Sequence, residues 1–455
     1  MIRNPFFMWY SPRRNVSNVT GLQVVNILRF ITFLIIAIVF TKIGVSKEQI
    51  GLFEMSLFLV SISNFFWVTG IIQAFLPLYK GSNTFGDLAN EDERKSPEIF
   101  NTFLVLIVFS LFVFAIGLIV QEHFSVFGRR GKAPLLNVTL WYLLLSSPAN
   151  LVEYIYMVRN KSGNTLSYAY ITYAIQLAAA ILPPIYGYSV IWSLRGLVLV
   201  AIIRNLWLFT LIYNYARIRF SFPFIKELLY IATPLLFSSL ISGSAQYVDG
   251  LVVSIHFPAE KFAVFRFGAK ELPFVIMLAT GLSNAMLTEF SSKENVRDTL
   301  EKIKNKSLRI MHTMFPLSMV LLLFADPMYK FVFSPEFARS ADIFVVYLLT
   351  ILSRLLFPHT ILMGKKKTRA VLIVSVMEVI INVGLSLWLV NHYGAVGVAL
   401  ATIIAYFVAK AALVVYNYVR LDIAPGEYIP IRWYLTYSVM LGTLFVLLDR
   451  GIIVI

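Results

Sequence analysis

The chain has no cysteine and few charged residues. Without cysteine there are no disulfides, no thiolate metal sites and no cysteine nucleophile. Charged residues make up only 14% of the 455 residues, and 58% of the residues are hydrophobic. Soluble domains carry about 25% charged residues, and the mean hydropathy here is +0.77. Together these values exclude a soluble globular protein and predict an all-α polytopic membrane protein.

Acidic residues are scarce relative to basic ones. There are 24 Asp and Glu against 39 Lys and Arg, which gives a formal net charge of +15. In a soluble protein this excess would suggest nucleic acid. Cytoplasmic loops of membrane proteins are themselves enriched in Lys and Arg, so we expect no nucleic-acid partner.

Signatures of cofactor and metal binding are also missing. No glycine-rich loop of the phosphate-cradling kind is present, so ATP is not expected as the energy source. The five histidines are dispersed without metal-ligand spacing. We therefore predict no catalytic residue, no cofactor and no metal. Coupling to a proton gradient, a sodium gradient or the membrane potential stays open.

Thirteen apolar segments are long enough to cross a bilayer, which takes about 20 residues each. Twelve of them lie near 20–43, 50–79, 99–121, 135–158, 166–187, 191–214, 228–252, 264–288, 309–333, 341–363, 369–391 and 395–419. The thirteenth lies near 433–455. We expect about 12–14 transmembrane helices.

The distribution of basic residues predicts the orientation. If the N-terminus is cytoplasmic, the inner segments hold 23 Lys and Arg and the outer segments hold nine. This asymmetry favours a cytoplasmic N-terminus.

An internal repeat predicts the organisation of the spans. Glu48 and Glu260 open similar segments 212 residues apart, and Gly70 and Gly281 follow them 211 residues apart. A Tyr-Asn-Tyr-x-Arg sequence also ends the sixth and the twelfth span. Two halves of six spans each have the same orientation, so an axis along the membrane normal would relate them, as in some secondary transporters. We predict two six-helix lobes related by this pseudo-two-fold axis, and an additional C-terminal segment. Their bounds are 1–217, 218–420 and 421–455.

Two basic residues in the eighth span predict the kind of substrate. Arg266 and Lys270 are four residues apart, so they share one face of a helix. A charge at membrane depth costs about 2.5–3.5 kcal/mol on insertion scales, and such groups normally face a protein-lined, watery cavity. A basic cavity favours an anionic substrate.

Several segments resemble a known transporter family. They are 49–53 (Gln-Ile-Gly-Leu-Phe), 234–236 (Pro-Leu-Leu) with Asp249, 262–266 (Phe-Ala-Val-Phe-Arg) and 393–402. Over about residues 20–420 the chain resembles the multidrug/oligosaccharidyl-lipid/polysaccharide (MOP) exporter superfamily, in its polysaccharide branch of Wzx-type lipid-linked oligosaccharide flippases. The resemblance implies two lobes around a cavity lined mainly by spans 1, 2, 7 and 8.

The intramembrane charges on those four spans are the candidate site. Guanidinium groups bind phosphate oxygens in bidentate fashion, and ammonium acts as a point charge. Arg29, Arg266 and Lys270 are therefore the predicted substrate-binding residues, as the resemblance to lipid II flippases also implies for spans one and eight. The alternative is that Arg29 snorkels to the interface and that Lys270 pairs with Glu271.

Three acidic residues are predicted charge partners or ion-coupling groups: Glu54, Asp249 and Glu378. Structural pairing is the favoured role for Glu54 and Asp249, and Glu378 is the candidate ion-coupling group in the second lobe. Five further charges on other spans are expected to pair between helices or to face headgroups. They are Glu153, Arg195, Arg204, Arg354 and Lys410.

The sequence and the resemblance together predict a flippase of a bacterial inner membrane. Its substrate would be an undecaprenyl-pyrophosphate-linked oligosaccharide for O-antigen, capsule or exopolysaccharide, moved by alternating access. The expected partners are this substrate, membrane lipids and other polysaccharide-assembly proteins. One alternative is a multidrug or solute exporter of the same superfamily, whose cavity is typically acidic or aromatic. The other is a membrane-embedded glycosyltransferase or polymerase, which should carry catalytic residues on a sizeable outer loop.

Overall fold

The regular secondary structure of the chain is helical. The computed structural model describes residues 18–79, 95–123, 135–243, 245–269, 279, 281–283, 285–287 and 296–452. Within these ranges no strand forms, and one isolated bridge joins Ser96 and Ala216. The predicted all-α class is confirmed. Its physical reason is that a helix satisfies every backbone polar group within one segment, which a bilayer demands.

Seven helices in the described part of the chain are long and apolar enough to cross a membrane, and nine if each of two bent helix pairs counts as one span. The seven are α1 (Asn18–Lys42), α2 (Lys47–Leu78), α3 (Pro97–His123), α6 (Ser162–Ile185), α7 (Val190–Tyr215), α17 (Thr368–Leu421) and α19 (Ile431–Asp449). The first bent pair is α12 (Val296–Leu323) with α13 (Ala325–Val332), at 71°. The second joins 340–354 to α16 (Pro358–Gly364), at 42°.

The chain divides into two compact units, unit 1 (Met1–Ser239) and unit 2 (Leu240–Ile455). The division falls near the end of α8 (Phe222–Gly243). The predicted lobe boundary at 217/218 and the separate segment 421–455 stay predictions.

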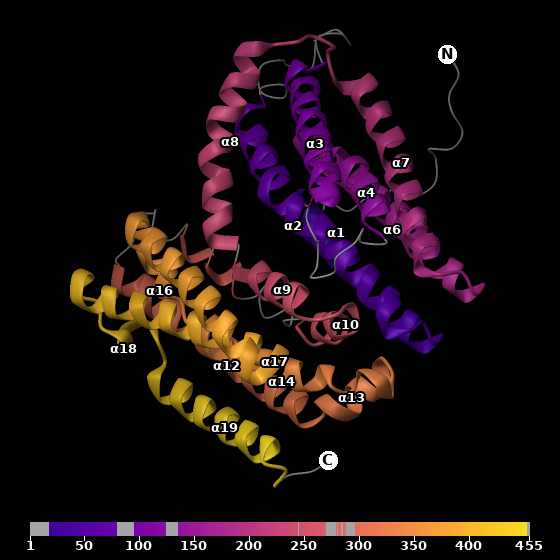
Figure 1. Ribbon diagram of the computed structural model, residues 1–455. Helices are drawn as coiled ribbons and strands as arrows, with labels where there is room; N and C mark the ends of the chain where they lie inside the picture. Colours follow the sequence, from indigo (N-terminus) through magenta and orange to yellow (C-terminus); the bar gives the residue numbers. More distant parts are fainter. Residues whose placement is uncertain are drawn as a thin grey trace. The chain divides into compact units, whose positions relative to one another are not determined.

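Unit 1 is a bundle of long helices (Figure 1). Besides those already given, it contains α4 (Leu136–Ala149) and α5 (Leu151–Val158). Helix α6 packs against both α1 and α7, and α4 packs against α3 and α7. A Cβ on Gly196 of α7 would lie 2.5 Å from the carbonyl oxygen of Ala179 on α6. Only glycine permits this close backbone approach.

Unit 2 contains shorter helices around α17. They are α9 (Ala245–His256), α10 (Ala259–Gly268), η3 (Pro335–Phe337), α14 (Ser340–Leu348), α15 (Ile351–Arg354) and α18 (Pro425–Tyr428). Helices α9, α14 and α16 pack on α17, and α10 packs on α14. The C-terminal α19 packs on α12 (Figure 1), where His312 Nδ1 lies 2.7 Å from the Tyr437 hydroxyl.

Helix α17 covers two predicted spans, 369–391 and 395–419, and the chain turns back between them. Gly394 has φ 62° and ψ −142°, which is not a helical conformation. Asn382 Nδ2 donates to Thr402 Oγ1 at 3.0 Å although twenty residues separate them. In a straight helix twenty residues span about 30 Å, so this bond requires the reversal. At Gly397 an added Cβ would collide with the carbonyl oxygen of Leu389, so the turn is tight.

We predict that Gly394→Ala destabilises the protein while Gly384→Ala does not. The backbone at 394 is accessible essentially to glycine alone, and such strain costs about 1–3 kcal/mol. An added Cβ there meets nothing closer than 3.9 Å, so the loss reflects the backbone alone. Gly384 lies in a helical stretch with open space around it. Thermal unfolding of the purified protein in detergent compares the two, and equal midpoints would contradict the argument.

Candidate functional site

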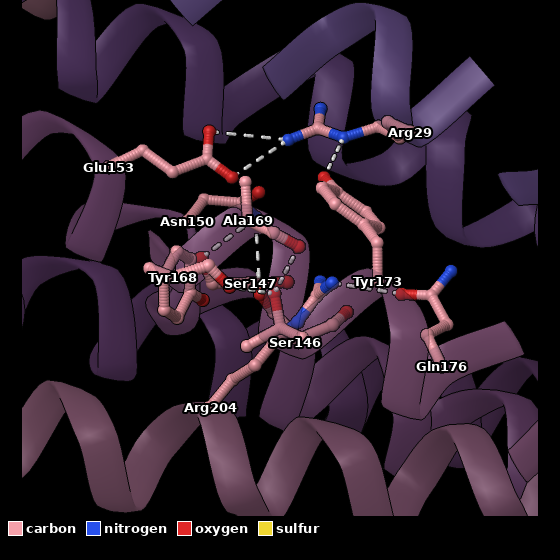
Figure 2. A network of polar contacts seen from close by, with 11 residues as sticks. Arg29, Ser146, Ser147, Asn150, Glu153, Tyr168, Ala169, Tyr173, Gln176 and Arg204 are labelled. Carbon is pink, nitrogen blue, oxygen red and sulfur yellow. Dashed lines mark hydrogen bonds and ion pairs between the residues drawn. The ribbon is translucent and has the colours of Figure 1, made fainter. Parts of the chain in front are cut away.

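Arg29 lies within a polar network in unit 1 (Figure 2). Its Nε donates a hydrogen bond of 2.8 Å to the hydroxyl of Tyr173 on α6. Its Nη2 reaches the two carboxylate oxygens of Glu153 on α5 at 3.3 and 3.4 Å. Side chains of two other helices, α5 and α6, therefore contact this guanidinium.

A second guanidinium lies on the other side of Tyr173. Arg204 of α7 lies over the Tyr173 ring, 4.8 Å from its centroid, and donates to Gln176 Oε1 at 2.9 Å (Figure 2). Tyr173 thus accepts from one arginine through its hydroxyl and meets the other through its π face. Two arginines and one glutamate give this network a net positive charge, which favours an anion.

Glu153 is placed by a break between α4 and α5. Pro148 lies in the last turn of α4, and the backbone N–H of Asn150 bonds to Ser147 O at 3.3 Å rather than to Ser146 O. The Asn150 side chain donates to both of these carbonyls at 3.1 Å, so neither is left unsatisfied. The new helix starts at Leu151, and Glu153 stands in its first turn.

The two partners of the ion pair differ in exposure. The side chain of Arg29 is 41% exposed, whereas that of Glu153 is 8% exposed. Within the described part of the chain, Nη1 of Arg29 donates no hydrogen bond. Arg29 is therefore held from one side and open on another.

The structure pairs the predicted residue Arg29 with Glu153, which the sequence analysis expected only to pair between helices. The sequence gives no signal for Tyr173 and Gln176, because polar residues spaced along α6 do not indicate which helix they face. The predicted partner Glu54 lies on α2 and is buried, at 7% exposure.

Asp249 in unit 2 is buried among oxygen-bearing side chains. Its carboxylate accepts from the Thr402 hydroxyl at 2.6 Å and from the Tyr347 hydroxyl. Asn382 donates to Thr402, and its own Oδ1 accepts from Ser386 at 3.2 Å. These groups come from α9, α14 and both arms of α17.

The donor atoms around Asp249 are hard oxygens. Carboxylate and hydroxyl groups suit hard cations such as Na⁺, and a carboxylate also takes a proton. No cluster of three or more His, Cys, Asp or Glu suited to a metal ion occurs within the described ranges. Asp249 is predicted from the sequence as a charge partner or coupling group, and the polar pair Asn382 and Ser386, four apart in an apolar run, is a further sequence signal for this set.

Arg266 lies half-buried on α10, a helix whose backbone is tied to its neighbours. The Tyr329 hydroxyl donates to Phe267 O at 2.8 Å, and Ser340 Oγ donates to Val264 O at 2.8 Å. Arg266 also interacts electrostatically with Tyr247 on α9. Lys270 and Glu271 lie outside the described residues, so the shared face with Arg266 stays a prediction.

Glu378 belongs to a separate charged cluster in unit 2. It interacts electrostatically with Lys410 and Arg354. Lys410 donates to Leu356 O at 3.3 Å, and Arg354 lies over the Tyr406 ring at 4.6 Å. The interhelical pairing expected for Lys410 and Arg354 fits this arrangement.

Three solved structures resemble this chain along most of its length. The lipid II flippase MurJ, in an inward closed conformation, has a TM-score of 0.66 at 18% identity over 94% of this chain and 92% of its own. An inward-facing multidrug resistance MATE family transporter of the MOP superfamily gives 0.57 at 13% identity over 94% and 99%. A MOP superfamily transporter from Pyrococcus furiosus gives 0.53 at 15% identity over 89% and 94%. At these identities the likeness shows the fold alone.

The sequence was compared with curated proteins and with family models. No curated protein matches the chain. The family model of polysaccharide biosynthesis proteins matches residues 44–342. The chain therefore belongs to the family of polysaccharide biosynthesis proteins, and its fold is that of the MOP superfamily transporters.

Proposed function

We propose that the chain is a flippase for undecaprenyl-pyrophosphate-linked oligosaccharide in a bacterial inner membrane. The observation that carries the proposal is the guanidinium of Arg29, which Tyr173 and Glu153 contact in unit 1, together with a second arginine, Arg266, in the last turn of α10 in unit 2. Membership of a polysaccharide biosynthesis family supports a glycan-linked substrate. A lipid II flippase shares the fold, which supports a lipid-linked one.

The pyrophosphate is the part of this substrate that the arginines would bind. Guanidinium and phosphate form bidentate, charge-assisted hydrogen bonds. Arg29, Arg266 and Lys270 would hold the headgroup during alternating access while the polyprenyl tail stays in lipid. The proposal assigns no catalytic step, since the structures that share the fold are transporters. The N-terminus would lie in the cytoplasm, and other polysaccharide-assembly proteins would be partners.

Asp249 is the proposed coupling group. Its carboxylate and the hydroxyls of Thr402 and Tyr347 supply oxygen ligands from α9, α17 and α14. A cation bound there would tie these helices together and stabilise one conformation of unit 2. Glu54 keeps its proposed role of charge partner. Glu378, predicted as the ion-coupling candidate of the second lobe, is now proposed as a charge partner of Lys410 and Arg354.

The competing function is export of drugs or solutes, which the shared fold with a multidrug transporter allows. Cationic substrates call for an acidic site. The net positive charge around Arg29 and Arg204 favours the anionic substrate instead.

We predict that Arg266→Ala lowers binding of a lipid-pyrophosphate-linked oligosaccharide by at least about 30-fold, because truncating one partner of a buried charge pair costs roughly 2 kcal/mol or more. Binding to the purified protein and transport in proteoliposomes are the measurements. Lys261→Ala is the matched control, since Lys261 is exposed on the same helix and lies over Phe257. Full transport activity of Arg266→Ala, or binding of an organic cation in place of the lipid, would contradict the flippase assignment.

We also predict that sodium stabilises the wild type through Asp249. At a concentration 100 times its dissociation constant, a ligand specific for the native state adds about 2.7 kcal/mol. The melting temperature should therefore rise in sodium chloride relative to choline chloride of equal ionic strength, and Asp249→Asn should lose this rise. Asp326→Asn removes a half-exposed carboxylate paired with Lys330 in the same unit and should keep it. If sodium does not raise the melting temperature of the wild type and a pH gradient drives transport, the coupling ion at Asp249 is a proton.

A further inference from the structure

The two contacts that hold Arg29 are unequal. The bond to the Tyr173 hydroxyl is 2.8 Å, a normal hydrogen-bond length. The contacts to Glu153 are 3.3 and 3.4 Å and share a single nitrogen, Nη2. Charge-assisted bonds are typically about 2.7–2.9 Å, and the strong Arg–carboxylate geometry uses two parallel N–H groups. Tyr173 therefore tethers the guanidinium, whereas Glu153 only neutralises it.

Glu153, the more loosely bound partner, is an anion, and it contacts Arg29 where an anionic ligand would bind. The half-exposed side chain of Arg29 can receive a ligand, and its Nη2 is the nitrogen that Glu153 occupies. A phosphate group that makes a fork-like contact with this guanidinium uses Nη2, because Nε is bonded to Tyr173, and there it competes with the carboxylate of Glu153. Since Nε is already bonded to Tyr173, the exchange can proceed without loss of the guanidinium's orientation.

The displaced carboxylate would still have positive charge nearby. Arg204 interacts electrostatically with Glu153 and with Tyr173 from α7. The Glu153 side chain is only 8% exposed, so leaving it uncompensated would be costly. The positive charge of Arg204 reduces this cost, so Glu153 can leave Arg29 and return to it.

We propose that Glu153 is an exchangeable counter-anion that occupies Arg29 when no substrate is bound, and that the anionic headgroup of the substrate displaces it. This inference rests on the proposed function and adds its exchange step. Glu153 lowers the affinity for the headgroup and so promotes its release on the far side. Tyr173 is a positioning residue that keeps Arg29 in place throughout.

The test compares two variants that each delete one contact of Arg29. The probe is farnesyl pyrophosphate, with the uncharged farnesol as reference, and its dissociation constant is measured on the full-length protein in detergent. Glu153→Gln keeps the size of the side chain and removes its charge. Tyr173→Phe keeps the ring beneath Arg204 and removes the hydroxyl. Glu227→Gln, an exposed carboxylate of unit 1, controls for the change in net charge.

The two variants should move in opposite directions. Glu153→Gln should bind farnesyl pyrophosphate up to about 5-fold more tightly, the factor expected for a partly exposed ion pair, and should turn over more slowly in proteoliposomes. Tyr173→Phe should bind it several-fold more weakly. In an Arg29→Ala background, Glu153→Gln should have no effect. If Glu153→Gln does not yield folded protein, Glu153→Asp replaces it. Its shorter carboxylate withdraws from Nη2 and should tighten binding to a smaller extent.

Three results would overturn the exchange. Unchanged or weaker binding by Glu153→Gln, with binding by the wild type lost in Arg29→Ala, would make Glu153 purely structural and leave the flippase proposal intact. A gain that persists in the Arg29→Ala background would show that Glu153 acts elsewhere. Failure of both the wild type and Glu153→Gln to bind farnesyl pyrophosphate would overturn the exchange, and a fully active Arg266→Ala would separately overturn the flippase.

Discussion

The cost of a charge inside an apolar bundle governs the placement of the polar side chains in this protein. At membrane depth that cost is about 2.5–3.5 kcal/mol on insertion scales. In unit 1 it is offset because Arg29 meets Glu153 and Tyr173, and Arg204 meets Gln176 and the Tyr173 ring. In unit 2 hydroxyl groups surround Asp249. Each cluster draws on several helices, so the charges also fix how those helices pack.

Two interruptions of regular helix create these clusters. The break at Asn150 starts a new helix whose first turn carries Glu153. The turn at Gly394 folds α17 back on itself and brings Asn382 to Thr402, beside Asp249. At Gly394 a conformation that a regular helix cannot adopt lets polar groups distant in sequence share one site. At Asn150 the backbone stays in the helical region, and the change is a hydrogen bond to the carbonyl three residues before it. The remaining helices supply an apolar scaffold.

For the proposed flippase function, a binding group that is neutralised by a loose ion pair has a direct use. A permanently free guanidinium within a bilayer would be costly and would bind an anionic headgroup too tightly to release it. A short, well-formed ion pair would exclude the headgroup. The long contact between Arg29 and Glu153 lies between these extremes, while the Tyr173 bond preserves the geometry.

Composition alone determined the all-α membrane class, because only helices satisfy their own backbone bonds in lipid. Isolated charges in apolar runs marked Arg29, Arg266 and Asp249 as exceptional, since each needs a compensating environment. The sequence could not name the partners. Arg29 and Glu153 lie 124 residues apart, and Asp249 and Thr402 lie 153 apart. Which side chains meet depends on the rotation of each helix and on its neighbours, and these follow from packing over the whole unit. Tertiary structure alone therefore decided that Glu153 faces Arg29 and that hydroxyl groups face Asp249.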